Sequence, residues 1–272
     1  MFFLEDEHKY IHKVTGGEYP SVTTILGHYK NKFDSISISE KYVETHPEIQ
    51  TPEGAKELID RYMLDMSVDE FLSEPVTAER LRDFWSQASL NATIKGNNFH
   101  YTQEIQTIYL ETNLPSDYND HVDNLWTDLA DGVYPELRIW HDDYQIAGTI
   151  DKVVIKHPYV DIYDYKTNKR VLSKGSDRKK MLYPLHFLND ADYYHYQMQL
   201  NIYGYLLELW GYKVRKLEIH HKRFLDSDEV PANYRMMWET PEQVKKLKII
   251  PLEYYPIRIK NFLDYDLRRR TA

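Results

Sequence analysis

The spacing of apolar and polar residues along the chain predicts a hairpin followed by a helical region. Residues 2–5 and 9–14 alternate between apolar and polar side chains, as the two strands of a hairpin do. Between about residues 37 and 131 the pattern is mostly helical, and Pro52 stands where a helix commonly begins. We therefore expect the N-terminal part to be a hairpin with helices after it.

A strand-rich region follows. Three segments are rich in β-branched and aromatic residues, which favour strands: 134–140, 145–155 and 159–165. An amphipathic helix is expected over residues 192–210, ended by Gly211, and a returning strand over 214–221. The predicted order of this region is three strands, helix, strand.

Further helices are expected on both sides of these strands. One is predicted over residues 91–111, another over 118–130, one from Pro241 and one after Pro256. The length allows one sizeable α/β domain with elaborations. We expect a single domain in three parts: a hairpin and helical elaboration at 1–90, a core at 91–222 and a C-terminal helical extension at 223–272.

Composition excludes several kinds of chemistry. The chain has 272 residues and no cysteine, which excludes disulfides, cysteine-ligated zinc and a cysteine-bound iron–sulfur cluster. The start of the chain is acidic within five residues, at Glu5, Asp6 and Glu7, and does not look like a secretory signal. No apolar run approaches the length needed to span a membrane. We therefore expect a cytoplasmic protein with no membrane partner.

Charge is unevenly distributed. The formal net charge of −9 argues against a protein that merely coats nucleic acid. It is compatible with a metal-dependent enzyme, because metal-binding carboxylates add negative charge that cations neutralise. A basic stretch over residues 166–180, which includes Lys169 and Arg170, and the arginines at 268–270 could contact phosphates. The alternatives are a solvated loop and a frayed tail. The 24 tyrosines could stack bases or reflect a compositional habit.

Asp164 and Lys166 stand at the end of an apolar strand. Residues i and i+2 of a strand point to the same side, so the two charged side chains should lie together on one side of the strand. A carboxylate can hold a divalent metal, and an adjacent ammonium can position a water, which together suit phosphodiester hydrolysis. A charged pair on a strand is also common as a solvated face.

Asp151 interrupts the apolar stretch of the preceding strand. Such an acid is costly to bury unless it is paired or bound to a metal. Asp151 and Asp164 lie on neighbouring strands joined by a tight turn, so their side chains could converge on one ion. Oxygen ligands of this kind suit Mg²⁺ or Mn²⁺. Gly148, in the same strand, would let backbone or substrate approach closely.

Two helical segments add polar residues at one-turn spacing. Gly96 and His100 lie one turn apart in the expected helix at 91–111, and a neutral imidazole can ligate a metal or contact phosphate. Gln199 and Tyr203 share a face of the helix at 192–210. Each segment alone is equally compatible with an ordinary core or surface position.

Taken in chain order, these segments resemble the RecB-like exonuclease branch of the PD-(D/E)XK nuclease superfamily. The matching pattern is GxxxH, GxxD, DxKT and QxxxY, at residues 96–100, 148–151, 164–167 and 199–203. The resemblance covers about residues 91–222, and Tyr-Pro-Ser-Val-Thr at 19–23 also looks like the start of phage and bacterial members. It implies an α/β (α+β) protein with a restriction-endonuclease-like core, a mixed central sheet flanked by helices.

The same resemblance implies roles for the site residues. Asp151 and Asp164 would bind one or two Mg²⁺ or Mn²⁺ ions, with His100 completing or neighbouring the site. Glu136 matches a frequent additional acid of the family. Lys166 would orient the attacking water and stabilise developing negative charge. The residues that would support the site or contact DNA are Gly96, Gly148, Thr167, Lys169, Arg170, Gln199 and Tyr203.

The leading interpretation is an exonuclease acting on DNA, single-stranded or at duplex ends, in recombination, repair or replication in a bacterial or phage-infected cell. No glycine-rich P-loop is present, so the chain is no helicase–nuclease fusion, although a helicase, an annealing protein or a single-strand-binding protein could be its partner. Three alternatives stay open: a structure-specific endonuclease, a catalytically silent nuclease fold that binds nucleic acid, and an unrelated metal-dependent phosphoesterase acting on small molecules.

Overall fold

A computed structural model describes residues 1–4, 7, 9–62, 64, 66–112, 129–168, 170–175, 179–222 and 247–272. The helix expected from Pro241 and almost all of the one expected over 118–130 lie outside these residues. The chain divides into two compact units. The sheet unit comprises Met1–Asn31, His100–Arg223 and Lys246–Ala272, and the helical unit comprises Lys32–Phe99 and Phe224–Lys245.

The sheet unit is built on five strands in the order β4-β5-β6-β7-β8. Their bounds are Gly132–His141, Ile146–Lys156, Tyr159–Lys166, Lys213–His221 and Lys248–Pro251. Strands β6 and β7 are parallel, and the other neighbours are antiparallel. The sheet is therefore mixed, as expected. The short strand β8 was not expected from the sequence.

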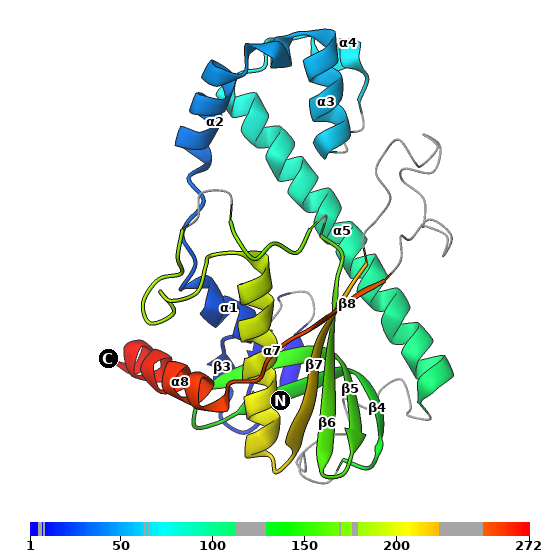
Figure 1. Cartoon of the computed structure of the whole chain (residues 1–272), viewed down its shortest axis with the longest axis vertical. Coiled ribbons are helices and arrows are strands. Elements are labelled where there is room, and N and C mark those ends of the chain that lie inside the picture. The colour runs from blue at the N-terminus through cyan, green and yellow to red at the C-terminus, as the bar shows by residue number, and fades with distance from the viewer. Residues whose placement is uncertain are drawn as a thin grey trace. The chain divides into compact units, whose positions relative to one another are not determined.

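Helix α7 (Asp192–Leu209) packs on this sheet and connects β6 to its parallel neighbour β7. The short helix α1 (Val22–Gly27) and the C-terminal helix α8 (Pro256–Thr271) pack against α7 (Figure 1). Buried residues of α7, such as Leu200, Leu206 and Leu207, join the aliphatic side chains of the strands in one core. Gly211 has a φ of +98°, the left-handed conformation in which glycine commonly follows a helix.

A second, small sheet lies at the N-terminus of the same unit. Its strands are β1 (Phe2–Leu4), β2 (Lys9–Ile11) and β3 (Glu18–Tyr19), and each neighbouring pair is antiparallel. The expected hairpin is therefore confirmed. The hydroxyl groups of Tyr10 and Thr149 are 2.9 Å apart, which connects this sheet to β5.

The basic C-terminus is part of a packed helix rather than a frayed tail. Asp266 on α8 is fully buried and accepts hydrogen bonds from Tyr29, at 2.8 Å, and from Arg270, at 2.6 Å. Arg270 also donates to the backbone oxygen of Tyr144 at 2.7 Å. A buried carboxylate needs such partners, so Arg270 has a structural function here.

The helical unit contains α2 (Ser35–Thr45), η2 (Pro47–Gln50), α3 (Pro52–Tyr62), α4 (Val68–Phe71) and the first part of α5 (Ala78–Glu111). Helix α3 begins at the proline that the sequence indicated. Helix α5 begins well before residue 91, because Leu81 and Phe84 pack in a core of their own with Phe71. None of the helices that the structure describes is long and apolar enough to cross a membrane.

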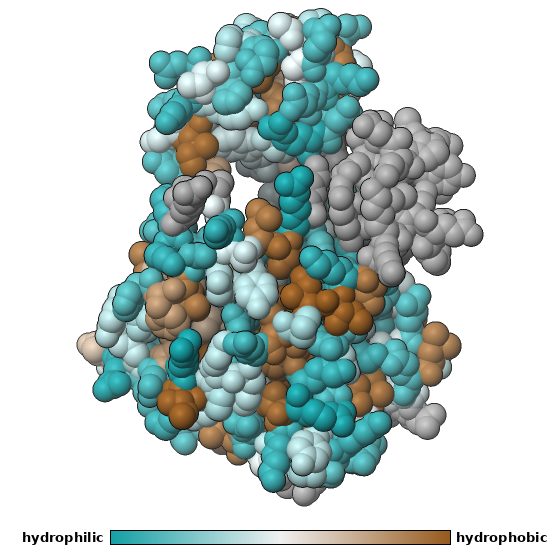
Figure 2. Space-filling view, viewed as in Figure 1, coloured by the Kyte–Doolittle hydropathy of each residue, from teal (hydrophilic) through white to brown (hydrophobic). Residues whose placement is uncertain are grey.

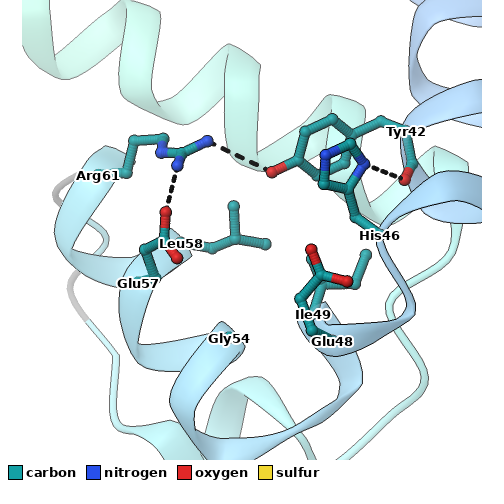
Figure 3. Close-up of a pocket in the computed structure, with 8 residues that line it drawn as sticks. All are labelled: Tyr42, His46, Glu48, Ile49, Gly54, Glu57, Leu58 and Arg61. Carbon is teal, nitrogen blue, oxygen red and sulfur yellow. Dashed lines mark hydrogen bonds and ion pairs between the residues drawn. The ribbon is translucent and has the colours of Figure 1, made fainter.

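A small pocket of about 110 Å³ opens on the helical unit between η2 and α3 (Figure 3). Tyr42 and His46 stack with their ring centroids 4.1 Å apart, and Arg61 donates to the hydroxyl of Tyr42 at 3.3 Å. Gly54 sits against the backbone of Glu48, where a Cβ would lie 2.0 Å from the carbonyl oxygen. These contacts hold the unit's short helices together.

Candidate metal centre

Two carboxylates face each other at a point in β4 and β5 where the alternation of buried and less buried residues is interrupted. We call this interruption the slip. On β5 the buried side chains Ile150 and Val153 are three positions apart instead of two, and β4 shows the same slip opposite them. Asp151 lies inside this interval. Glu136 lies between Pro135 and Leu137, whose partners Lys152 and Ile150 flank Asp151. The slip explains how an acid can occur within an apolar strand without pointing into the core.

Glu136 has an unusual backbone for its residue type. Its φ is +46°, in the left-handed region that non-glycine residues seldom adopt. Such conformations cost free energy and persist where the surroundings enforce them, often at functional sites. Here the left-handed residue occupies the slip in β4 and brings its carboxylate to that of Asp151.

His100 completes a three-residue group with these acids. Its Nδ1 lies 3.4 Å from Oδ2 of Asp151, and its ring packs edge-on to Tyr165. One ligand atom from each of His100, Glu136 and Asp151 can be chosen so that all three lie within 4.8 Å of one another. An imidazole nitrogen and two carboxylate oxygens in this arrangement could hold a metal ion.

Burial and the neighbouring charges shift the pKa of each residue in this group. Burial disfavours the charged form of His100, but attraction to Asp151 outweighs it and raises the pKa of His100 to about 9. Burial, and then repulsion from Asp151, raises the pKa of Glu136 to about 8. Burial opposes ionisation of Asp151 as well, yet His100 keeps its pKa below the ordinary value. A cation among these groups would relieve the repulsion between the two carboxylates.

Asp164 and Lys166 lie beside this group, at the end of β6. Their Oδ2 and Nζ atoms are 2.6 Å apart, so the two side chains share one side of the strand as the spacing predicts. Both are well buried, with 2% and 17% of the respective side chains exposed. The backbone N–H of Tyr165, between them, donates to Asp151 at 2.6 Å. This bond connects β6 to the three-residue group.

One carboxylate oxygen of Asp164 lacks a hydrogen bond among the described residues. Burial raises the pKa of its carboxyl to about 6, although the Lys166 ammonium opposes the shift. Its Oδ2 contacts Lys166 as an ion pair but, within the described part of the chain, has no partner at hydrogen-bonding angles. A buried carboxylate oxygen with spare acceptor capacity fits a nearby cation. Asp164 nevertheless falls outside the three-residue group, so direct ligation by Asp164 stays a prediction.

Gln199 and Tyr203 reach this site from α7. The Gln199 amide donates to Oδ1 of Asp164 and to the Tyr203 hydroxyl, both at a long 3.4 Å. Tyr203 is buried, and its ring occupies the space that Gly148 leaves, where a Cβ would lie 2.6 Å from Cε1 of Tyr203. The close approach to Gly148 is thus made by a side chain of α7, and not by the backbone or substrate that the sequence suggested.

The remaining residues that the sequence predicted to support the site or contact DNA lie directly after β6, in the loop beyond it and on α5, or outside the described residues. Thr167 directly follows β6 and is half-buried, whereas Arg170 is exposed in the loop beyond it. Lys169 lies outside the described residues. Gly96 lies on α5 one turn before His100, in the part of the helix that belongs to the helical unit.

Two residues near Lys166 were not singled out from the sequence. The ring of Tyr196 on α7 lies under the Lys166 ammonium, with Nζ 4.8 Å from its centroid. Lys30, which follows α1, has its pKa lowered by burial and by Lys166, against the attraction of Asp190 and Asp192. Because Lys30 is distant from Lys166 in sequence, no local motif could have indicated that it joins this region.

The chain matches no protein-family model and no curated protein.

Proposed function

We propose that this protein is a metal-dependent DNA nuclease of the PD-(D/E)XK type that its motifs resemble. One observation carries the proposal: the group His100, Glu136 and Asp151 lies beside the buried pair of Asp164 and Lys166. Metal-binding carboxylates next to a buried ammonium are the equipment for phosphodiester hydrolysis. The order of three strands, helix and parallel strand around the site supports the same fold.

The proposed metal is Mg²⁺ or Mn²⁺, held by His100, Glu136 and Asp151. When bound, such an ion would polarise the phosphodiester and neutralise negative charge as it develops. The chain's own residues supply the rest. Burial alone would lower the pKa of Lys166, but Asp164 raises it and keeps the ammonium charged. This ammonium would orient the attacking water and stabilise the negative charge that develops on the phosphate oxygens. Gln199 holds Asp164 in place.

Within this class, exonuclease action on DNA ends is the preferred mode, following the motif resemblance. A structure-specific endonuclease is the second mode. The two differ in a simple way, because an exonuclease requires a free end and an endonuclease does not. Circular DNA therefore distinguishes them.

The first test is cleavage of end-labelled DNA. Linear and circular substrates, each single- and double-stranded, are incubated with the full chain and Mg²⁺, Mn²⁺ or a chelator. We expect metal-dependent loss of linear DNA and intact circles. Cleavage of circles would favour the endonuclease. Absence of cleavage with all substrates, while the protein demonstrably binds Mn²⁺, would favour a nuclease fold that only binds DNA and would contradict the proposal.

A further inference from the structure

A second cavity lies in the sheet unit, on the side of α7 that packs toward α8. Its volume is about 550 Å³, within the range of pockets that hold small organic ligands. Residues 183–188, the first half of α7 and helix α8 line it. Figure 2 shows that apolar and polar residues are intermixed on the face that carries these helices. None of the metal-centre residues lines this cavity.

Exposed aromatic rings form one part of its wall. Tyr183 and Phe187 have 63% and 49% of their surface exposed, which is unusual for large rings beside a cavity. Tyr183 packs edge-on against Tyr265, with 5.2 Å between the ring centroids, so its orientation is fixed by a neighbour. His186 stacks on one face of Tyr183, with 5.5 Å between the ring centroids, so a planar ligand would stack on the opposite face.

Two arginines bring positive charge to the cavity. Arg258 lies over the rings of Phe187 and Tyr255, at 5.5 and 4.9 Å from their centroids, and makes no ion pair with a described residue. Arg268 donates through Nε to the backbone oxygen of Asp264 at 2.9 Å. No carboxylate occurs among the described residues that line the cavity. In a protein of net charge −9, this is a local positive site.

Gln197 adds a hydrogen-bonding group. It lines the cavity from α7 and is only 7% exposed, yet within the described residues its side-chain amide has no hydrogen-bond partner. The Gln197 amide atoms are accessible to solvent, so they can donate to or accept from a ligand in the cavity.

We propose that this cavity binds a nucleotide unit, with the base stacked on Tyr183 and Phe187, the phosphate held by Arg258 and Arg268, and the base edge hydrogen-bonded by Gln197. A planar, polar-edged and anionic ligand satisfies all three parts of the wall. Stacking on aromatic rings combined with cationic contacts is how proteins bind single-stranded nucleic acid without sequence preference.

The cavity and the metal centre lie on two faces of one helix. Gln199 of α7 contacts Asp164 in the metal centre, whereas Met198 and Asn201 line the cavity. The proposal rests on the proposed nuclease function in one respect, because it takes the nucleotide to belong to the substrate strand or to be a released mononucleotide. It adds a second contact point on the same strand, away from the metal centre.

The test measures binding of a fluorescein-labelled oligothymidylate to the full chain in chelator, where cleavage does not interfere. We expect Tyr183→Ala, Phe187→Ala and Arg258→Gln each to weaken binding roughly tenfold. Ile257→Ala, a 76% exposed neighbour on α8 outside the cavity, and Tyr159→Ala, a 45% exposed ring at the start of β6, are the controls and should bind as the wild type does. Unchanged melting temperatures would establish that the variants fold.

Two further arms locate and identify the ligand. An oligomer carrying 5-iododeoxyuridine should photo-crosslink to Tyr183 or Phe187, as read by mass spectrometry. Competition with thymidine monophosphate separates the sources: displacement of the oligomer supports a mononucleotide site, and lack of displacement supports a strand site. Normal oligomer binding by all three cavity variants would overturn the proposal. So would binding of an acidic, aromatic-ended peptide in this cavity without any binding of DNA.

Failure of this proposal is distinguishable from failure of the nuclease proposal. If the wild type cleaves DNA and the cavity variants bind it normally, only the cavity proposal fails. If the wild type cleaves no DNA, thymidine monophosphate binding that is lost in Arg258→Gln still supports the cavity, and only the nuclease proposal fails.

Discussion

The ring of Tyr203 lies directly against Gly148, so two of the four sequence motifs meet at one contact. A Cβ built on Gly148 would lie 2.6 Å from Cε1 and 3.1 Å from the hydroxyl oxygen of Tyr203. That hydroxyl accepts the hydrogen bond of Gln199, whose amide also donates to Asp164. The glycine therefore sets the position of α7 side chains that support the proposed catalytic pair.

The first prediction concerns this contact. Gly148→Ala should destabilise the protein by roughly 1–3 kcal/mol, because a fully buried ring must move to admit the methyl group. It should also reduce cleavage, since Tyr203 and Gln199 would shift together. Denaturant unfolding and the cleavage assay measure the two effects. Gly27→Ala is the matched control, because nothing lies within 4 Å of its added Cβ. Equal stability of the two variants would contradict the close packing.

The second prediction concerns the metal. Glu136→Gln keeps the size of the side chain but removes a carboxylate from the group with His100 and Asp151. Mn²⁺ affinity, measured by calorimetry, should fall by at least the roughly 10- to 100-fold that loss of an outer-shell partner costs, because Glu136 is a direct ligand. Glu218→Gln, which alters an acid paired with His220 on β7, is the control and should leave the affinity unchanged. Wild-type affinity in Glu136→Gln would remove this group as the metal site.

The arrangement of secondary structure could largely be predicted from the sequence, because it depends on local patterns. The three central strands, α7 and β7 have strong β-branched or amphipathic signals, and Gly211 marks where α7 ends. The start of α5 was not placed, since Leu81 and Phe84 are buried against other helices of the helical unit, a packing that the local pattern does not show. Strand β8 has only four residues, and its pairing with β7 is a long-range contact.

The candidate site could be predicted only in part, for a similar reason. The i, i+2 spacing of Asp164 and Lys166 directly predicts their contact. The grouping of Glu136 with Asp151 depends instead on the slip in β4 and β5 and on the left-handed backbone conformation of Glu136. The sequence pattern predicts neither feature. The contacts of Lys166 with Tyr196, and its influence on Lys30, depend on how α7 and α1 pack.

The third prediction concerns catalysis. Lys166→Ala should reduce the cleavage rate by roughly 100-fold or more, because the ammonium that stabilises developing charge is lost. The fold should survive, since the side chain lies at the end of β6 and not within the apolar core. Circular dichroism and the cleavage assay report the two properties. Lys156→Ala, at the exposed end of β5, is the control and should cleave normally. Full activity of Lys166→Ala would refute the assignment of the catalytic pair.

The fourth prediction concerns acid stability, through a carboxylate outside the metal centre. Asp190 accepts hydrogen bonds from the backbone N–H and the side-chain amide of Asn31, both at 2.7 Å, and lies 2.6 Å from Nε2 of His195. Burial opposes its ionisation, but the bonds from Asn31 outweigh burial, so its pKa lies below the ordinary value. The carboxylate joins the segment after α1 to the segment before α7.

The sign of the pH effect follows from this direction. A carboxyl whose pKa is lower in the folded state stabilises the fold above its unfolded pKa of about 3.9, and this stabilisation is lost as the pH falls through the folded value. Asp190→Asn should therefore lower the melting temperature at pH 7 by a few degrees, and the difference from the wild type should shrink toward pH 3. Asp143→Asn, at an exposed position, should show no such pH-dependent difference. A difference that stays constant from pH 7 to pH 3 would show that the charge of Asp190 does not stabilise this connection.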